Sequence, residues 1–376
     1  MVYAAVVVAA LAAVGLVMGL VIGTGEAAHA TLVTSPAAAP VPGGTPRPDP
    51  TPVWTTDDHP ASGDPLAVGT VVTWSTHRLA GRDAVTGAVR WSYTRTDLDI
   101  CDAAQVDGRA FVLFRRGGNC DELSTFAAGT GARGWFRTMP DDGAGRLLFG
   151  AAGLVVAYPG SFHVMETSGG IDRYPSVPVT GAGCTFTAVV PGATGILVSE
   201  RCGDGDHLAL WSNLGEKSEP KQLWRVAVDR GVVALAASDT TVFDYDATRG
   251  AVVARSVNDG GVLGPVGLTP TPSGPARAPV VADTDVLLPI GGEVYAVSEA
   301  GAPQWSTPTT GSPTTVDAAG TAVFVPTPAG TAELDETTGT TTLTYAFTTA
   351  VTGDDPRVYP AGGGLLVAGA GLAYLR

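Results

Sequence analysis

The sequence predicts an all-β protein, an eight-bladed β-propeller with seven blades as the alternative. One turn motif recurs along the chain, and short apolar strands precede most of its copies. The composition agrees, because Gly (50) and Pro (28) are abundant while only 15% of the 376 residues are charged, a balance typical of many tight turns. We expect one transmembrane helix and a Pro-rich stalk before the propeller. The predicted domains are therefore an anchor (1–24), an extracytoplasmic linker (25–52) and the propeller (53–376).

The N-terminal segment Val2 to Gly23 contains no charged side chain. A segment of this length can cross a bilayer as one helix, so we expect an uncleaved signal anchor. A cleaved signal peptide ending at "AHA" (Ala28 to Ala30) is the alternative, although the apolar part of such peptides usually spans about 7–15 residues. The stretch Ser35 to Pro52 is rich in proline and is expected to form an extended, semi-rigid stalk between membrane and propeller.

The spacing of the four cysteines predicts two local disulfides. Cys184 and Cys202 flank a hairpin turn expected at Pro191 to Gly195, which places them nearly opposite each other. Cys101 and Cys120 bracket a second hairpin, around "VDGR", less symmetrically. A zinc site would usually show CxxC pairs, which are missing, and free buried cysteines would not be expected to bracket hairpins twice. Two disulfides imply an oxidising compartment, so we expect a single-pass cell-membrane protein with its propeller on the extracytoplasmic side.

The recurring turn joins a strand that ends in small or acidic residues to a strand that begins near an aromatic residue. Its copies lie roughly 35–50 residues apart, a length that suits the four short strands of one propeller blade. Glycine in the turn permits positive φ, the preceding Thr or Asp can bond backbone amides, and the tryptophan is expected to fill space between neighbouring blades. The copies begin at Arg82, Phe126, Met165, Trp211, Tyr245, Val297 and Leu334.

The two ends of the chain are expected to complete one blade together. An eighth hairpin, Gly364 to Arg376, ends the chain without its own turn and outer strand. The segment Pro52 to Asp57 carries Trp54 where the outer strands carry their aromatic residue, so it is the natural donor of the missing strand. The seven-bladed alternative applies if the divergent unit around Gly215 is not a true blade.

In outline the repeat reads "G.VY...D..TG...W" and resembles the pyrroloquinoline-quinone-type propeller repeat, from about Trp54 onward. Three segments, Trp91 to Cys101, Gly117 to Trp135 and Leu197 to Leu210, resemble an actinobacterial family of membrane-anchored propellers that includes the mycobacterial polar growth factor A group. This resemblance implies a role in cell-envelope assembly, with association with a mycolate-lipid exporter and effects on lipoglycan maturation. Quinone binding in such repeats would imply adjacent cysteines and a carboxylate-rich calcium site. The sequence shows neither, so we expect no cofactor.

Motifs that carry chemistry are missing from the sequence. The five histidines are scattered, and neither HExxH nor G-x-S-x-G occurs, so no catalytic or metal-binding residue is predicted. The aspartates within Cys202 to Leu208 lack the full calcium-loop pattern and indicate a polar loop between strands. Arg115, Arg116, Asp121 and Glu122 lie beside a predicted disulfide and form a candidate binding rim, with an ordinary solvated loop as the alternative.

The net charge of −14 argues against a nucleic-acid partner, because phosphate binding needs clustered Lys and Arg. We expect a non-catalytic scaffold in cell-envelope biogenesis that binds an envelope lipid, a glycan or a membrane transporter. The alternative is an enzyme that acts on an envelope sugar or lipid through scattered carboxylates in the propeller funnel. The scaffold predicts binding without turnover, whereas the enzyme predicts that activity is lost when one or two acids are removed.

Overall fold

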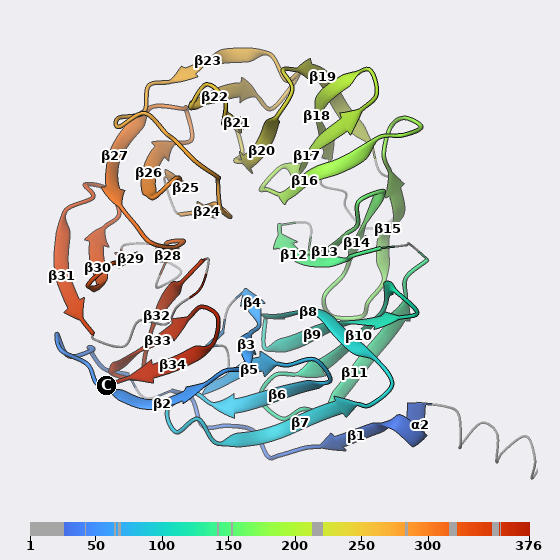
Figure 1. Ribbon diagram of the computed structural model, residues 1–376, viewed down its shortest axis with the longest axis vertical. Helices are drawn as coiled ribbons and strands as arrows, with labels where there is room; N and C mark the ends of the chain where they lie inside the picture. The colour runs from blue at the N-terminus through green and yellow to red at the C-terminus, as the bar shows by residue number, and fades with distance from the viewer. Residues whose placement is uncertain are drawn as a thin grey trace, which may run out of the picture.

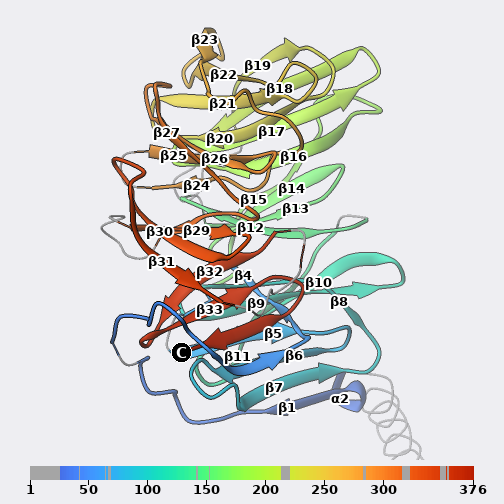
Figure 2. The same cartoon turned by 60° about the vertical axis from the view of Figure 1, so that its left-hand side comes forward.

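The structure, a computed structural model, describes residues 26–376 except 42, 64, 67–68, 141–142, 152, 213–220, 283–284, 316–321, 348–352 and 354. Eight sheets stand in a ring around a central axis (Figure 1), so the eight-bladed prediction is confirmed. The same ring is seen obliquely in Figure 2. The predicted anchor, residues 1–24, lies outside the described residues. Within the described part of the chain, no helix is long and apolar enough to cross a membrane.

Each blade is a small sheet that runs from the centre of the ring to its rim. The first four blades are blade 1 with β3 (His59–Pro60), β5 (Thr70–Trp74), β6 (Arg78–Asp83), β7 (Val89–Arg95) and β1 (Ala30–Val33); blade 2 with β4 (Ser62–Gly63), β8 (Asp99–Val106), β9 (Arg109–Arg116), β10 (Asn119–Ala127) and β11 (Arg133–Thr138); blade 3 with β12 (Arg146–Gly150), β13 (Gly153–Ala157), β14 (Ser161–Met165) and β15 (Asp172–Pro178); and blade 4 with β16 (Thr185–Pro191), β17 (Gly195–Cys202), β18 (Gly205–Ser212) and β19 (Gln222–Val228).

The second half of the ring repeats this plan, and its last blade takes a strand from the start of the chain. The blades are blade 5 with β20 (Val232–Ala237), β21 (Thr241–Asp246), β22 (Ala251–Ser256) and β23 (Val262–Val266); blade 6 with β24 (Val280–Val281), β25 (Asp285–Ile290), β26 (Glu293–Ser298) and β27 (Pro303–Pro308); blade 7 with β28 (Thr314–Thr315), β29 (Ala322–Thr327), β30 (Gly330–Asp335) and β31 (Thr341–Ala346); and blade 8 with β32 (Arg357–Ala361), β33 (Gly364–Ala368), β34 (Leu372–Leu375) and β2 (Pro52–Thr56).

The middle strands of the blades are buried on both faces because each blade packs against two neighbours. In β14 and β25 every side chain is buried, whereas most residues of the outer strand β11 are exposed. Middle strands therefore have continuous apolar sequences instead of an apolar–polar alternation. The core is divided into clusters, many of which lie between two adjacent blades, as where Trp91 of blade 1 meets Phe114 and Phe126 of blade 2.

The recurring turn and its tryptophan form a contact between adjacent blades, as the sequence predicts. The indole Nε1 of Trp91 donates a hydrogen bond to the carbonyl oxygen of Ala128, in the repeat turn of blade 2, at 2.6 Å. Gly131 of that turn has φ of +73°, and a Cβ there would lie 2.7 Å from Cγ of Trp91, so only glycine fits. The equivalent pairs are Trp54 with Ala84, Trp135 with Thr167, Trp224 with Val257 and Trp305 with Glu336.

One copy of the motif lies elsewhere in its blade than the sequence predicts. The copy at Tyr245 to Ala254 forms the turn between β21 and β22, inside blade 5. Trp224 contacts the following turn instead, at Val257, where Ser256 to Gly261 connect β22 and β23. Asp246 accepts hydrogen bonds from two amides of its own turn. In the following turn, Ser256 and Asp259 likewise accept hydrogen bonds from backbone amides. The same capping chemistry therefore serves both turns, so the local pattern does not distinguish them.

The N-terminal strand closes the ring, as predicted. β2 pairs antiparallel with β34, and Trp54 lies opposite Tyr374. The two rings stack with their centroids 6.5 Å apart. The indole of Trp54 donates to the carbonyl oxygen of Ala84 at 3.3 Å, so the strand also contacts blade 1. This pairing covers the open edge of the last blade.

The segment predicted to be a stalk is attached to the propeller wall instead of extending away from it. A single helical turn, α2 (Glu26–His29), leads into β1, which pairs antiparallel with β7 as the outermost strand of blade 1. Further along, the amide of Ser35 donates to the carbonyl oxygen of Thr130, and the guanidinium of Arg90 donates to that of Pro36. The physical reason is the unpaired edge of β7, which offers hydrogen-bonding groups that composition alone does not reveal.

Candidate functional site

A pocket of about 410 Å³ lies between blades 2 and 3. β4, which lies inside the ring (Figure 1) and pairs in parallel with β8, contributes Ser62 to its lining. The volume falls within the range of small-molecule sites. The lining residues are Ser62, Cys101, Asp102, Arg115, Cys120, Ala144, Gly145, Arg146, Leu147 and Leu148.

Asp102 is the carboxylate in this pocket, and it links the two blades. Its Oδ2 accepts a hydrogen bond from the amide of Leu147 on β12 at 2.8 Å, and its Oδ1 accepts from the amide of Ala103 at 2.8 Å. Burial raises the pKa of Asp102 to about 6, although both hydrogen bonds and the charge of Arg146 act in the opposite direction. The carboxyl group therefore titrates close to neutrality.

The raised pKa of Asp102 predicts a specific pH dependence of stability. A raised folded-state pKa contributes stability that is complete below the unfolded value and is lost as pH rises through about 6. The unfolding free energy of the wild type, relative to that of Asp102→Asn, is expected to fall by up to about 3 kcal/mol between pH 3.5 and 7. Chemical denaturation of both proteins across this range measures the difference. A constant difference would contradict the raised pKa.

Two arginines give the pocket its charge. Arg115 on β9 and Arg146 at the start of β12 are both exposed and both line the pocket. Guanidinium groups bind phosphate and carboxylate through paired hydrogen bonds. Two cations beside one carboxyl of raised pKa make this pocket locally positive on a chain whose net charge is −14. Its chemistry favours a small anionic group.

The structure separates the predicted binding rim into two places. Arg115 lines the pocket toward blade 3. Arg116 and Glu122 form an ion pair on the side toward blade 1, where Glu122 also accepts from Arg95 at 2.6 Å. Within the described part of the chain, the buried Oδ1 of Asp121 has no hydrogen-bond partner. The four residues do not form one surface, because neighbouring residues on a strand point to opposite faces of the sheet.

Both predicted disulfides are present. Cys184 and Cys202 lie opposite each other at the far end of the hairpin whose turn is at Pro191 to Gly195, with their Cα atoms 4.1 Å apart. The Cα atoms of Cys101 and Cys120 are 6.2 Å apart. The hairpin around "VDGR" joins β8 and β9 as expected, but Cys120 lies beyond it on β10. This second bridge therefore connects the two strands that flank β9.

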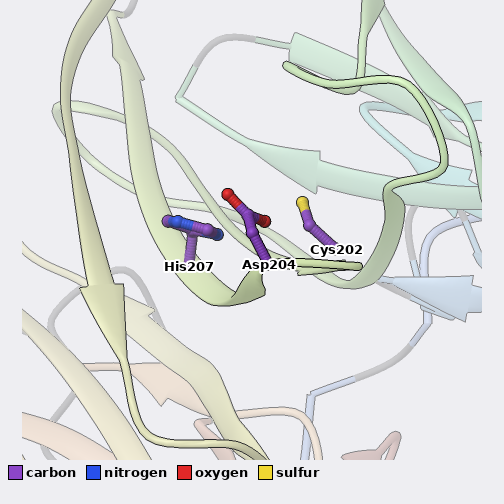
Figure 3. A group of neighbouring side chains, drawn as sticks. All are labelled: Cys202, Asp204 and His207. Atoms are coloured by element: carbon purple, nitrogen blue, oxygen red, sulfur yellow. The ribbon is translucent and has the colours of Figure 1, made fainter.

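A cluster of possible metal ligands occurs at the turn between β17 and β18. Figure 3 shows Cys202, Asp204 and His207, whose ligand atoms all lie within 4.8 Å of one another. Cys202 is bonded to Cys184 and has no thiolate to offer. Asp204 and His207 alone do not make a metal site, and the expected polar turn is the better description.

The sequence interpretation missed Asp102 and Arg146. Asp102 follows a disulfide cysteine, but its partner Leu147 lies 45 positions further along the chain. The pocket exists only where the inner strands of two blades meet. No local motif marks such a meeting point, so only a residue-contact map would have found it.

No protein-family model and no curated protein matches this chain. Solved structures do match. BamB from Moraxella catarrhalis aligns with a TM-score of 0.54 at 15% identity, covering 87% of this chain and 99% of that one. The computationally designed Ika8 protein aligns at 0.60 and 15%, covering 88% and 99%. Quinohemoprotein alcohol dehydrogenase from Comamonas testosteroni aligns at 0.54 and 13%, covering 87% and 76%. These likenesses establish that the chain has the fold of the pyrroloquinoline-quinone-like β-propellers.

Proposed function

We propose that this protein is a membrane-tethered, extracytoplasmic scaffold of cell-envelope biogenesis that binds its client through the pocket between blades 2 and 3. The observation that carries the proposal is the pocket itself, in which Arg115 and Arg146 flank Asp102. Two disulfides fit an oxidising compartment outside the cytoplasm. The apolar segment Val2 to Gly23 supplies the tether, which raises the effective concentration of a client in the same membrane.

The chemistry of the pocket narrows the class of client. Paired guanidinium groups suit the phosphate of a lipid or lipoglycan, or a carboxylate on a glycan or on an exporter loop. The resemblance of Trp91 to Cys101 and of Gly117 to Trp135 to the actinobacterial membrane-anchored propellers supports an envelope exporter as the associated membrane protein.

Crosslinking followed by purification of the full-length protein from its own membrane tests the scaffold. We expect an envelope lipid or transporter to co-purify. We expect Arg115→Ala/Arg146→Ala to reduce its recovery at least tenfold, since even one charged hydrogen bond contributes about 1.5–3 kcal/mol. Arg249→Ala is the matched control, because Arg249 lies in an exposed ion pair on blade 5. Recovery of only the material bound by a segment covering residues 1–52 would contradict the scaffold.

An envelope-acting hydrolase is the second candidate, because a carboxyl with a raised pKa in a pocket is a possible general acid. Against this role, both oxygens of Asp102 accept hydrogen bonds from backbone amides, an arrangement suited to joining blades. If the protein is a hydrolase, Asp102→Asn abolishes turnover of envelope glycans while binding persists. If it is a scaffold, neither protein shows turnover.

A further inference from the structure

Side chains from two blades hold Glu26, the first described residue. Its carboxylate accepts a hydrogen bond from the Tyr93 hydroxyl at 2.5 Å and forms a two-point ion pair with Arg133, at 2.5 and 3.0 Å. Burial alone would raise the pKa of Glu26, but the hydrogen bonds from Arg133 and Tyr93 lower it overall. Burial and the hydrogen bond to Glu26 raise the pKa of Tyr93 to about 12. The carboxylate thus attaches the start of α2 to blades 1 and 2.

The position of Glu26 limits how far the propeller can stand from a membrane. Only Thr24 and Gly25 separate it from the apolar segment that ends at Gly23. Even a fully extended chain of that length reaches only about 10 Å. Because β1 continues along blade 1, the Pro-rich sequence adds no reach between the membrane and the propeller.

We propose that the outer edge of blade 2, made by Phe136, Arg137 and Ile171 of the adjoining turn, rests on the lipid headgroup layer. This inference rests on the membrane tether of the proposed function and adds the orientation of the propeller. The chain enters at this edge, since Arg133, which binds Glu26, lies on the same strand as Phe136 and its guanidinium carbon is 5.5 Å from the centre of that ring.

The chemistry of the blade 2 edge matches the interface of a bilayer. The side chains of Phe136 and Ile171 are 55% and 61% exposed, and the bond from Arg137 to the carbonyl oxygen of Gly170 holds the turn that leads to Ile171 beside β11. The guanidinium of Arg137 donates to the carbonyl oxygens of Phe136 and Gly170, which are neutral acceptors. Exposed apolar and aromatic side chains with arginine between them are suited to the headgroup region.

The charge of the whole protein strengthens this assignment. A chain of net charge −14 is repelled by anionic lipids on most of its surface. An edge that carries arginine beside apolar side chains can approach such lipids closely. The N-terminal apolar segment therefore joins the propeller beside the edge of blade 2, which is compatible with the lipid headgroup layer.

Fluorescence quenching by the headgroup layer tests the orientation. The full-length Phe136→Cys variant is labelled with bimane at position 136. It is placed in vesicles of phosphatidylcholine and phosphatidylglycerol (3:1) that contain a nitroxide-headgroup lipid. The matched control is Leu263→Cys on β23, which is 61% exposed and lies across the ring (Figure 1). We expect quenching at position 136 to be at least twofold stronger than at position 263. Equal quenching in vesicle-bound protein would overturn the inference and leave the tether standing.

Flotation of the same vesicles separates this inference from the proposed function. Protein that does not float with the vesicles would overturn the tether, and the orientation with it. A second variant tests the attachment itself: Glu26→Lys is expected to reduce quenching at position 136 to the level at 263 while flotation is unchanged. Asp229→Lys, in the exposed ion pair with Arg249, is the matched control and is expected to change neither readout. Unchanged quenching in Glu26→Lys would overturn the role assigned to Glu26.

Discussion

Replacement of Trp91 by alanine is expected to lower the free energy of unfolding by about 3–5 kcal/mol. Trp91 is completely buried between blades 1 and 2. Its ring stacks on Phe126 with centroids 6.1 Å apart, and its Nε1 donates to Ala128 at 2.6 Å. The change removes apolar contacts and leaves a buried carbonyl oxygen without its donor. Denaturation in guanidinium chloride measures the loss.

Trp91→Phe is the control for the ring contribution, because it keeps an aromatic ring in the cluster and removes only the donor and part of the volume. We expect it to cost clearly less than Trp91→Ala. If both variants lose under about 1 kcal/mol, the contact between the tryptophan and the next turn does not stabilise the ring, contrary to the burial argument.

The blade count and the closure of the ring could be predicted because the repeat turn is local. Gly131 needs positive φ and Trp91 needs space against it, and both requirements appear in a short stretch of sequence. Trp54 near the start of the propeller marks the missing outer strand in the same way. Features that lie within one turn and its neighbouring strands leave a pattern that can be recognised along the chain.

The candidate pocket could not be predicted, because its parts come together only in the folded ring. Asp102 and Leu147 lie on different blades. Arg115 and Arg116 are adjacent on β9 and point to opposite sides of blade 2. The rim expected from "FRRGGNCDE" would have formed only if both arginines lay in a loop instead of a strand. The attachment of β1 to β7 is likewise a pairing of distant segments. Alternation along a strand would have corrected the rim, but no local rule would have supplied the pocket.

Arg95 lies among charged side chains between blades 1 and 2, and its replacement is expected to cause the second large loss of stability. Its side chain is only 2% exposed. It donates to both oxygens of Asp97, at 2.8 and 2.9 Å, and to Glu122 at 2.6 Å. Burial alone would lower the pKa of Arg95, but its hydrogen bond to Asp97 and the charge of Glu122 raise it overall. The guanidinium therefore stays charged and satisfies two carboxylates at once.

Arg95→Met keeps most of the apolar stem and removes the charge. We expect it to destabilise the protein by about 3 kcal/mol, because the buried Glu122 loses one of its two arginine partners and keeps only Arg116, whose side chain is 58% exposed. Glu122 is the critical group, since its side chain is only 8% exposed. Arg249→Met makes the same exchange in an ion pair with Asp229 whose two side chains are 65% and 62% exposed, and it is expected to change stability far less. Denaturation curves of both variants, and of Arg95→Met/Glu122→Gln, complete the test. The double variant should recover part of the loss, because it removes a buried charge that Arg116 alone would otherwise compensate. Similar losses in Arg95→Met and Arg249→Met would show that burial does not distinguish the two ion pairs.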